Sequence, residues 1–368
     1  MAVMKDDAER TWNYLPTEAV GSIPRCHDLQ DAIRKHVLGD IDAAALEAAY
    51  DRAVRATMAE LEGTGSPIIS DGEQRKTHSF ASYSVDGGDQ FAPDGLALPF
   101  ADGHVRRLPR LIRGPFRFKR YAFESLAKAR PLTRLPMKQA IISPSALSLF
   151  YPPDGIADYS RDEFIVDLLD EQEREIRGCL DAGAQRVQID FTEGRLSLKL
   201  DPSGSLLSSF VELNNMVLQR FTPHEIERIC VHTCPGADHD STHSADVDYS
   251  ELLPSLFELN AGSFCIAMAE ERRPEQALQT IARHIKQGQR AYIGVIDVND
   301  PRIETPELVC KRILQAAKYL PVDQLGSTDD CGFSPFCDDV STSRETAFAK
   351  IRARVEGTIM ASKSLGLA

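Results

Sequence analysis

Short runs of β-branched and apolar residues alternate with segments of helical periodicity along most of this 368-residue chain. We recognise eight such runs, at 17–24, 66–73, 138–145, 186–193, 229–236, 263–270, 291–300 and 324–333. Amphipathic segments separate several of them, for example 161–183, 274–288 and 305–320. Because strands that alternate with helices form parallel βαβ units, eight units predict an α/β protein, a single (β/α)8 TIM barrel over residues 1–368.

One segment, 84–137, interrupts this alternation after the second predicted strand. Between residues 106 and 138 there are eleven Lys or Arg residues and one Glu, in a chain whose net charge is −13. We interpret 84–137 as an insertion at the active-site end of the barrel. It is either a solvated amphipathic helix or a lid whose positive charge attracts an anionic substrate.

Composition excludes several functional classes. The acidic net charge argues against general nucleic-acid binding, which needs a positively charged footprint. No apolar run approaches 18 residues, so we expect no membrane span, and the polar N-terminus lacks the apolar core of a signal peptide. We therefore expect a cytoplasmic protein whose partners are small molecules. The sequence carries no indication of its oligomeric state.

Polar residues follow the predicted strands, at the end of the barrel where active sites lie. The candidates for substrate binding, catalysis and metal binding are Gly21, Ser22, Glu73, Ser143, Asp190, Glu193, His232, Cys234, Asp297, Asn299 and Cys331. This concentration of titratable and ligand-forming groups is typical of an enzyme pocket. A purely structural barrel needs no such pattern.

His232 and Cys234 are two residues apart, so on a strand both side chains lie on the same face. Together with Cys331 they form a candidate Zn²⁺ site, because zinc binds imidazole and thiolate, and a catalytic site keeps a fourth position open. His239 and His243 are alternative ligands at i, i+4 spacing, but their polar loop is more typical of solvent-exposed histidines.

Five motifs make the chain similar to a known family. They are VGSIPR (20–25), DGEQRK (71–76), VQIDFTEG (187–194), HTC (232–234) and TDDCGF (328–333). Their order and spacing resemble the catalytic barrel of the cobalamin-independent methionine synthases, from about Thr17 to the last helix. The first half of the long two-barrel members has no counterpart, so the chain resembles the short single-barrel members, which include epoxyalkane:coenzyme M transferase.

The resemblance implies roles for the matching residues. His232, Cys234 and Cys331 match the zinc ligands that activate an acceptor thiol, and Ser22, Glu73 and Asp190 match positions that bind homocysteine. A free thiol is mostly protonated at neutral pH, and binding to a divalent cation deprotonates it so that it can attack an alkyl carbon.

The departures from the family concern the rest of the site. Ala267 stands where long methionine synthases have a further zinc-binding glutamate, and Glu270, three residues later, is a candidate replacement. The run 297–299 (Asp-Val-Asn) replaces an Asp-Ile-His element whose histidine is thought to protonate the leaving folate nitrogen. Phe150 and Tyr151 lie where the family has a tryptophan that stacks on folate.

Three hypotheses follow from these matches and departures. The first is a zinc-dependent S-alkyl- or methyltransferase, in which the thiolate of a homocysteine- or coenzyme M-like substrate attacks an alkyl donor other than the usual folate. The second is a methionine synthase that uses 5-methyltetrahydrofolate, and the third is a non-catalytic zinc-binding barrel. We expect His243, Asp297 and Asn299 at the catalytic end. If the donor is an epoxide, the proton for its alkoxide would come from His243, His78 or Tyr151.

Overall fold

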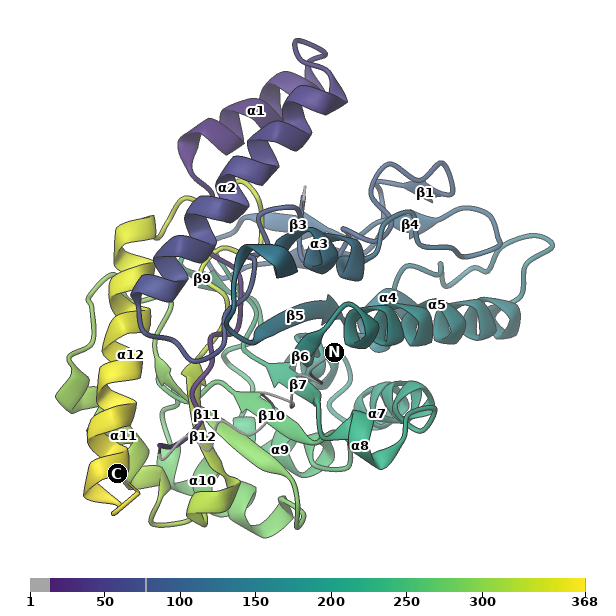
Figure 1. Cartoon of the computed structure of the whole chain (residues 1–368). Coiled ribbons are helices and arrows are strands. Elements are labelled where there is room, and N and C mark those ends of the chain that lie inside the picture. The colour runs from purple at the N-terminus through teal and green to yellow at the C-terminus, as the bar shows by residue number, and fades with distance from the viewer. Residues whose placement is uncertain (1–13, 77, 368) are drawn as a thin grey trace, which may run out of the picture.

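The computed structural model describes residues 14–76 and 78–367, so the polar N-terminal residues 1–13 lie outside the described part. Six parallel strands form the central sheet in the order β12-β11-β10-β7-β6-β5 (Figure 1). They are β5 (Met137–Ile142), β6 (Ala184–Asp190), β7 (Ile229–Thr233), β10 (Ser263–Ile266), β11 (Arg290–Ile296) and β12 (Leu325–Asp329). Nearly all their residues are buried, as expected for parallel strands covered on both faces.

The first two predicted strands, 17–24 and 66–73, are extended segments that make only isolated bridges. Thr17 pairs in parallel with Ser327 of β12, and Ile69 pairs in parallel with Met137 of β5. A hydrogen bond from the Ile23 amide to the Gly72 carbonyl (3.0 Å) joins the two segments to each other. These contacts connect the two edges of the sheet and give the topology predicted for the TIM barrel.

Proline and left-handed backbone explain why these two segments do not form full ladders. Pro24 and Pro67 lack the amide that a ladder needs. Gly72 and Glu73 have φ angles of 68° and 59°, which turn the chain out of the extended conformation at the end of the second segment. The prediction of two regular strands here was therefore wrong in detail.

Helices follow the strands and surround the sheet (Figure 1). One helix follows each extended segment or strand: α2 (Ala43–Gly63), α3 (Ala122–Ala129), α5 (Arg161–Asp181), α7 (Ser205–Leu218), α9 (Tyr249–Leu256), α10 (Pro274–His284), α11 (Pro306–Ala316) and α12 (Arg344–Ser364). Short helices accompany them: α4 (Pro144–Ser148), α6 (Gly194–Leu200), α8 (Pro223–Ile226), η2 (Arg130–Leu132) and η3 (Val322–Gln324). Helix α1 (His27–Val37) pairs with α2, and the pair projects from the body.

The segment 84–137 combines an added region with a regular part of the barrel. Its first part forms two small antiparallel sheets, β1 (Phe91–Ala92) with β4 (Arg110–Leu111), and β2 (Ala97–Pro99) with β3 (Val105–Arg107). Its second part is α3, which packs against α5 and β5. We call residues 97–107 the β2–β3 hairpin.

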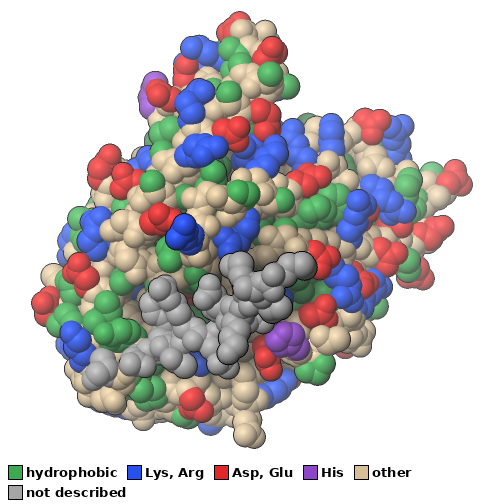
Figure 2. All heavy atoms as spheres, viewed as in Figure 1, with side chains coloured by type: hydrophobic (Ala, Val, Ile, Leu, Met, Phe, Trp, Pro, Cys, Tyr) green, Lys and Arg blue, Asp and Glu red, His purple; other side chains and the backbone are tan. Residues whose placement is uncertain are grey.

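Most basic side chains of residues 106–138 are paired with acids. The ion pairs are Arg106 with Asp238 and Asp338, Arg110 with Asp94, Arg113 with Asp89, Arg117 with Asp167, Lys128 with Glu47 and Lys138 with Glu18. Charges of both signs are likewise interspersed over the face shown in Figure 2. Among the described helices, none is long and apolar enough to cross a membrane.

Candidate active site

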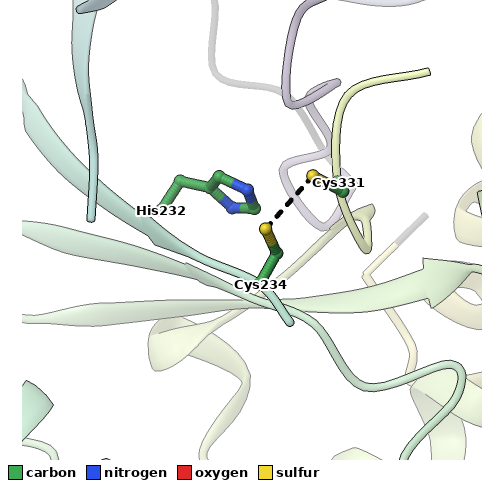
Figure 3. A group of neighbouring side chains, drawn as sticks. All are labelled: His232, Cys234 and Cys331. Atoms are coloured by element: carbon green, nitrogen blue, oxygen red, sulfur yellow. Dashed lines mark hydrogen bonds between the residues drawn. The ribbon is translucent and has the colours of Figure 1, made fainter. Parts of the chain in front are cut away.

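A histidine and two cysteines meet at the carboxyl ends of β7 and β12 (Figure 3). His232 lies on β7, Cys234 follows that strand and Cys331 follows β12. One ligand atom from each of the three side chains lies within 4.8 Å of the others, and the two Sγ atoms are 3.2 Å apart. All three residues are buried. The structure thus brings together the three predicted zinc ligands.

The free ring nitrogen of His232 indicates that this group can hold a metal ion. Its Nδ1 lies 3.3 Å from the carbonyl oxygen of Cys265, to which a protonated Nδ1 donates. Its Nε2 is buried and has no hydrogen-bond partner among the described residues. A histidine fixed through one nitrogen and unpaired at the other is the usual arrangement of a metal-binding imidazole. One imidazole and two thiols fit zinc with a fourth position open.

The electrostatic environment favours a thiolate at Cys234. The Cys331 thiol beside it, together with His232 and the Gly236 amide, holds the pKa of Cys234 well below its usual range although burial opposes this. The Gly236 amide donates to Cys234 Sγ at 3.3 Å. Since the thiolate is the form that binds metal, this environment prepares the site for a cation.

Three buried carboxyl groups line the same cavity as the cysteines: Glu73, Asp190 and Glu193. Burial raises the pKa of Asp190 to about 6, and Gln188 Nε2 donates to its Oδ1 at 2.6 Å. Glu73 has a left-handed backbone and lies 2.9 Å from the ammonium group of Lys76. The carboxyl groups of Glu73 and Asp190 favour a positively charged group on the ligand.

Glu193 is held by hydroxyl groups at the start of α4. Ser143 donates to its Oε1 at 2.6 Å, and Ser145 donates to the same oxygen. Burial raises the pKa of Glu193 to about 7. Ser143 itself is absent from the lining of the cavity, so it reaches the site through Glu193.

Ser22 connects the first extended segment to the loop that carries Cys331. The amide of Ser334 donates to Ser22 Oγ at 3.2 Å. A Cβ at Gly332 would lie 2.0 Å from Ser22 Oγ, so only glycine permits this approach. Gly21 stays behind the cavity lining, and a Cβ there would lie 3.1 Å from Glu73 Oε1.

The remaining predicted residues fall into two groups. His243 lines the cavity, and its ring meets Phe100 edge to face at 5.3 Å. Asp297 and Asn299 are not among the residues that line the cavity. Asp297 Oδ1 accepts a hydrogen bond from the amide of Asn299, and Asn299 Nδ2 donates to Glu270 Oε1. Glu270 is thereby engaged away from the sulfur atoms and does not belong to the group of ligand atoms around Cys234.

Sequence reasoning missed one part of the cavity wall. This wall comes from the β2–β3 hairpin and neighbouring loops, and it includes Phe80, Leu98, Phe100, Arg106, Arg107, Leu108, Pro109 and Phe336. These residues are remote from the strand ends, where barrel active sites are usually sought. The one available signal was the position of the insertion beside the active-site end.

Fold and site together define a β/α-barrel protein in which one histidine and two cysteines, a group that could hold a metal ion, lie beside buried carboxyl groups. Residues 15–356 match the family described as cobalamin-independent synthase, catalytic domain. The chain therefore belongs to this family, which confirms the resemblance seen in the motifs.

Relatives and solved structures agree with this assignment. The chain is 24% identical over 361 residues to a methionine synthase of Sulfurisphaera tokodaii, covering 95% of this chain and 94% of that sequence. A methionine synthase of Saccharolobus islandicus is 25% identical, with 95% and 96% covered. A B12-independent methionine synthase from Shewanella sp. W3-18-1, in complex with selenomethionine, has a TM-score of 0.76 at 20% identity, covering 96% of this chain and all of that one. A putative vitamin-B12 independent methionine synthase from Listeria monocytogenes gives 0.68 at 20%, covering 96% and 98%. The shared fold confirms the predicted class.

Proposed function

We propose that this protein is a zinc-dependent S-methyltransferase whose acceptor is a thiol of the homocysteine type. The observation that carries the proposal is one cavity lined by His232, Cys234 and Cys331 together with the buried carboxyl groups of Glu73 and Asp190. The first part of this set suits a thiol, and the second suits the ammonium group of an amino acid.

The residues of the chain divide the work as follows. His232, Cys234 and Cys331 would hold the zinc ion, which when bound lowers the pKa of an acceptor thiol and so supplies a thiolate at neutral pH. Glu73 and Asp190 bind the acceptor's ammonium group, and Ser22 lies beside them to orient its carboxylate. The apolar side of the hairpin excludes water and aligns the donor's methyl group with the sulfur.

The charges of the cavity favour an amino-acid thiol over a sulfonate such as coenzyme M. A sulfonate would face the carboxyl groups of Glu73 and Asp190, and of the two lining arginines Arg106 is already bound to Asp238 and Asp338. The relatives named methionine synthase support the same acceptor, because this chain matches almost their whole length.

The donor separates the two catalytic hypotheses. A donor other than the usual folate agrees with the position of Asn299, which is remote from the cavity lining and cannot act as an acid. Methionine synthesis from 5-methyltetrahydrofolate is the second candidate, supported by the names of the relatives. A non-catalytic zinc-binding barrel is less well supported, because Ser22, Glu73 and Asp190 all remain at the cavity.

The acceptor is tested by replacing Asp190→Asn and comparing two thiols, homocysteine and 4-mercaptobutanoate, which lacks the ammonium group. We expect the dissociation constant for homocysteine to rise about 10- to 100-fold, since a charged hydrogen bond contributes about 1.5–3 kcal/mol. The affinity for 4-mercaptobutanoate should change little. Equal weakening of both thiols, or of neither, would argue against an amino-acid acceptor. Zinc content and melting temperature of the variant serve as controls.

A further inference from the structure

Glu193 has one carboxyl oxygen that nothing in the described part of the chain pairs. Its Oε1 accepts hydrogen bonds from Ser143 and Ser145, whereas its Oε2 is buried and has no hydrogen-bond partner. Leaving a buried polar atom unpaired costs about 1–3 kcal/mol, so such atoms are rare in native proteins. Glu193 lines the cavity that holds the candidate thiol site, so a ligand bound there can supply the missing partner of Oε2.

The surroundings of Glu193 favour its neutral, protonated form. Asp190 faces it from β6, and the hydroxyls of Ser143 and Ser145 face it from α4. Asn214 of α7 donates to Ser145 Oγ at 2.8 Å, which fixes that hydroxyl. Within the described residues, Glu193 forms no ion pair. Burial, and to a smaller extent Asp190, raises the pKa of Glu193 to about 7, although the hydrogen bonds from Ser143 and Ser145 oppose this rise. Much of Glu193 therefore carries a proton at neutral pH.

The other titratable side chains considered as acids are less suitable. His243 lines the cavity, but burial lowers the pKa of its imidazole, which is therefore neutral at pH 7. His78 is exposed and bound to Asp86. The hydroxyl of Tyr151 donates to a backbone carbonyl, that of Tyr159, away from the lining residues.

We propose that Glu193 is the proton donor of the methyl transfer and that its Oε2 hydroxyl protonates the leaving atom of the donor. This inference rests on the proposed function. In the step, the acceptor sulfur forms a bond to the methyl carbon, and the bond from that carbon to the leaving atom breaks. The leaving atom keeps the electron pair and takes the proton, so Glu193 becomes a carboxylate and later regains a proton from water.

This role defines the class of donor. A basic nitrogen or an oxygen needs a proton when it leaves, whereas iodide or a neutral thioether does not. The donor that uses Glu193 is therefore one whose methyl or alkyl group is carried on nitrogen or oxygen. Glu193 would then protonate the leaving atom, a step for which Asn299 has no acidic group.

The test replaces Glu193→Gln, which keeps an oxygen for the two serine hydroxyls. Glu175→Gln is the matched control, because Glu175 is also buried with a pKa raised to about 7 but is absent from the cavity lining. With homocysteine as acceptor, each protein is given methyl iodide, 5-methyltetrahydrofolate and 1,2-epoxypropane. We expect E193Q to lose about 10²- to 10⁴-fold in rate with the donors that need a proton, the usual contribution of a general acid. The rate of E193Q with methyl iodide should be nearly unchanged. E175Q should keep its rates with all three donors.

A second measurement reports the proton directly. Carbon-13 NMR of protein labelled at the glutamate δ-carbon, assigned by comparison with E193Q, should show Glu193 titrating near pH 7. Equal losses of E193Q with all donors, or no loss with any donor, would overturn the proton-donor role. So would a wild-type protein that accepts methyl iodide but neither of the other two donors, or ionisation of Glu193 below about pH 5. A wild-type protein that methylates no thiol from any donor would instead overturn the proposed function itself.

Discussion

Two strand ends bring the side chains of His232, Cys234 and Cys331 together in one cluster of possible metal ligands. The alternation of side chains on β7 places His232 and Cys234 on the same face, and β12 brings Cys331 to them from 97 residues away. Each side chain alone has a bland explanation, as a core cysteine or a core histidine. The unpaired Nε2 of His232 and the short distance between the sulfurs favour the metal-site interpretation.

We expect Cys331→Ala to remove zinc and activity together while the barrel remains folded. The substitution deletes one of three ligands but takes only a small side chain from the core, so the cost in stability should stay at about 1–3 kcal/mol. Cys337→Ala is the control, because Cys337 is only partly buried and lies outside the group of ligand atoms. The measurement is zinc per protein by mass spectrometry of metals, with melting temperature alongside. Full zinc content in C331A would refute the assignment.

The proximity of His232, Cys234 and Cys331, and the position of Glu73 and Asp190 at the same cavity, could be predicted because these residues belong to short motifs at strand ends. The position of Asp297 could not be predicted, since its carboxylate accepts the amides of Asn299 and Asp300 and closes a local turn. The unpaired Oε2 of Glu193 was also invisible in the sequence. It depends on where α4 brings its serine hydroxyls.

At the level of elements, the β2–β3 hairpin contributes part of the wall of the cavity. Asp238 attaches it, because its Oδ2 accepts from His104 at 2.9 Å and from Arg106 at 2.6 Å. Backbone contacts add to this, such as the Ala101 amide to the Thr242 carbonyl at 2.9 Å. Asp238 follows Cys234 by four residues, so the hairpin is attached to the segment that carries this proposed metal ligand.

Asp238→Asn should loosen the hairpin, since His104 and Arg106 both lose a buried carboxylate as their partner. We expect amide hydrogen exchange in residues 97–107 to accelerate by about tenfold or more, a loss of at least about 1.4 kcal/mol of local stability. Asp94→Asn is the comparison, because it removes an exposed ion pair with Arg110 that should contribute little. Hydrogen exchange in the hairpin that is equally fast in wild type and D238N would show that Asp238 does not hold the hairpin in place.

Glu175 on α5 gives the fold a pH dependence of defined sign. Its carboxyl group accepts from Tyr83 (2.7 Å) and from the Ala122 amide (2.9 Å), and burial raises its pKa to about 7. In the unfolded chain a glutamic acid ionises near pH 4.3. Between these two values the unfolded state has lost its proton and the folded state has kept it, so stability falls as pH rises through this window.

The Glu175→Gln variant lacks this titration. Its free energy of unfolding relative to wild type should therefore rise by about 3 kcal/mol between pH 4.5 and 7.5, from about 1.4 kcal/mol per unit of pKa difference. Urea unfolding of both proteins across this range measures the difference. A constant difference, or one that falls with pH, would show that Glu175 is ionised in the folded protein.

The sequence predicted six of the eight barrel strands well, because short buried runs between amphipathic helices have few alternatives. The segments 17–24 and 66–73 became single bridges where proline and left-handed residues end the ladder. The hairpin was not predicted, since its strands of three residues are defined by pairing and by contacts with distant loops rather than by local pattern.

Viewed as a whole molecule, the protein places a cavity at the carboxyl ends of its parallel strands, where barrel enzymes have their active sites. Sulfur and imidazole groups, buried acids and an apolar wall share this cavity, and they come from several elements that are distant in sequence. The family relationship and the geometry lead to the same central claim, that a metal ion held at Cys234 activates the sulfur of a small thiol.

Thiol titration of the cobalt-substituted protein tests this claim most directly. Zinc would first be quantified in the purified protein, then exchanged for cobalt, and the absorption spectrum followed as homocysteine, cysteine or coenzyme M is added. We predict one metal per chain and a new thiolate-to-cobalt charge-transfer band with homocysteine, absent in the Cys331→Ala variant. A protein that binds no metal, or whose bound cobalt responds to none of the thiols, would contradict the account.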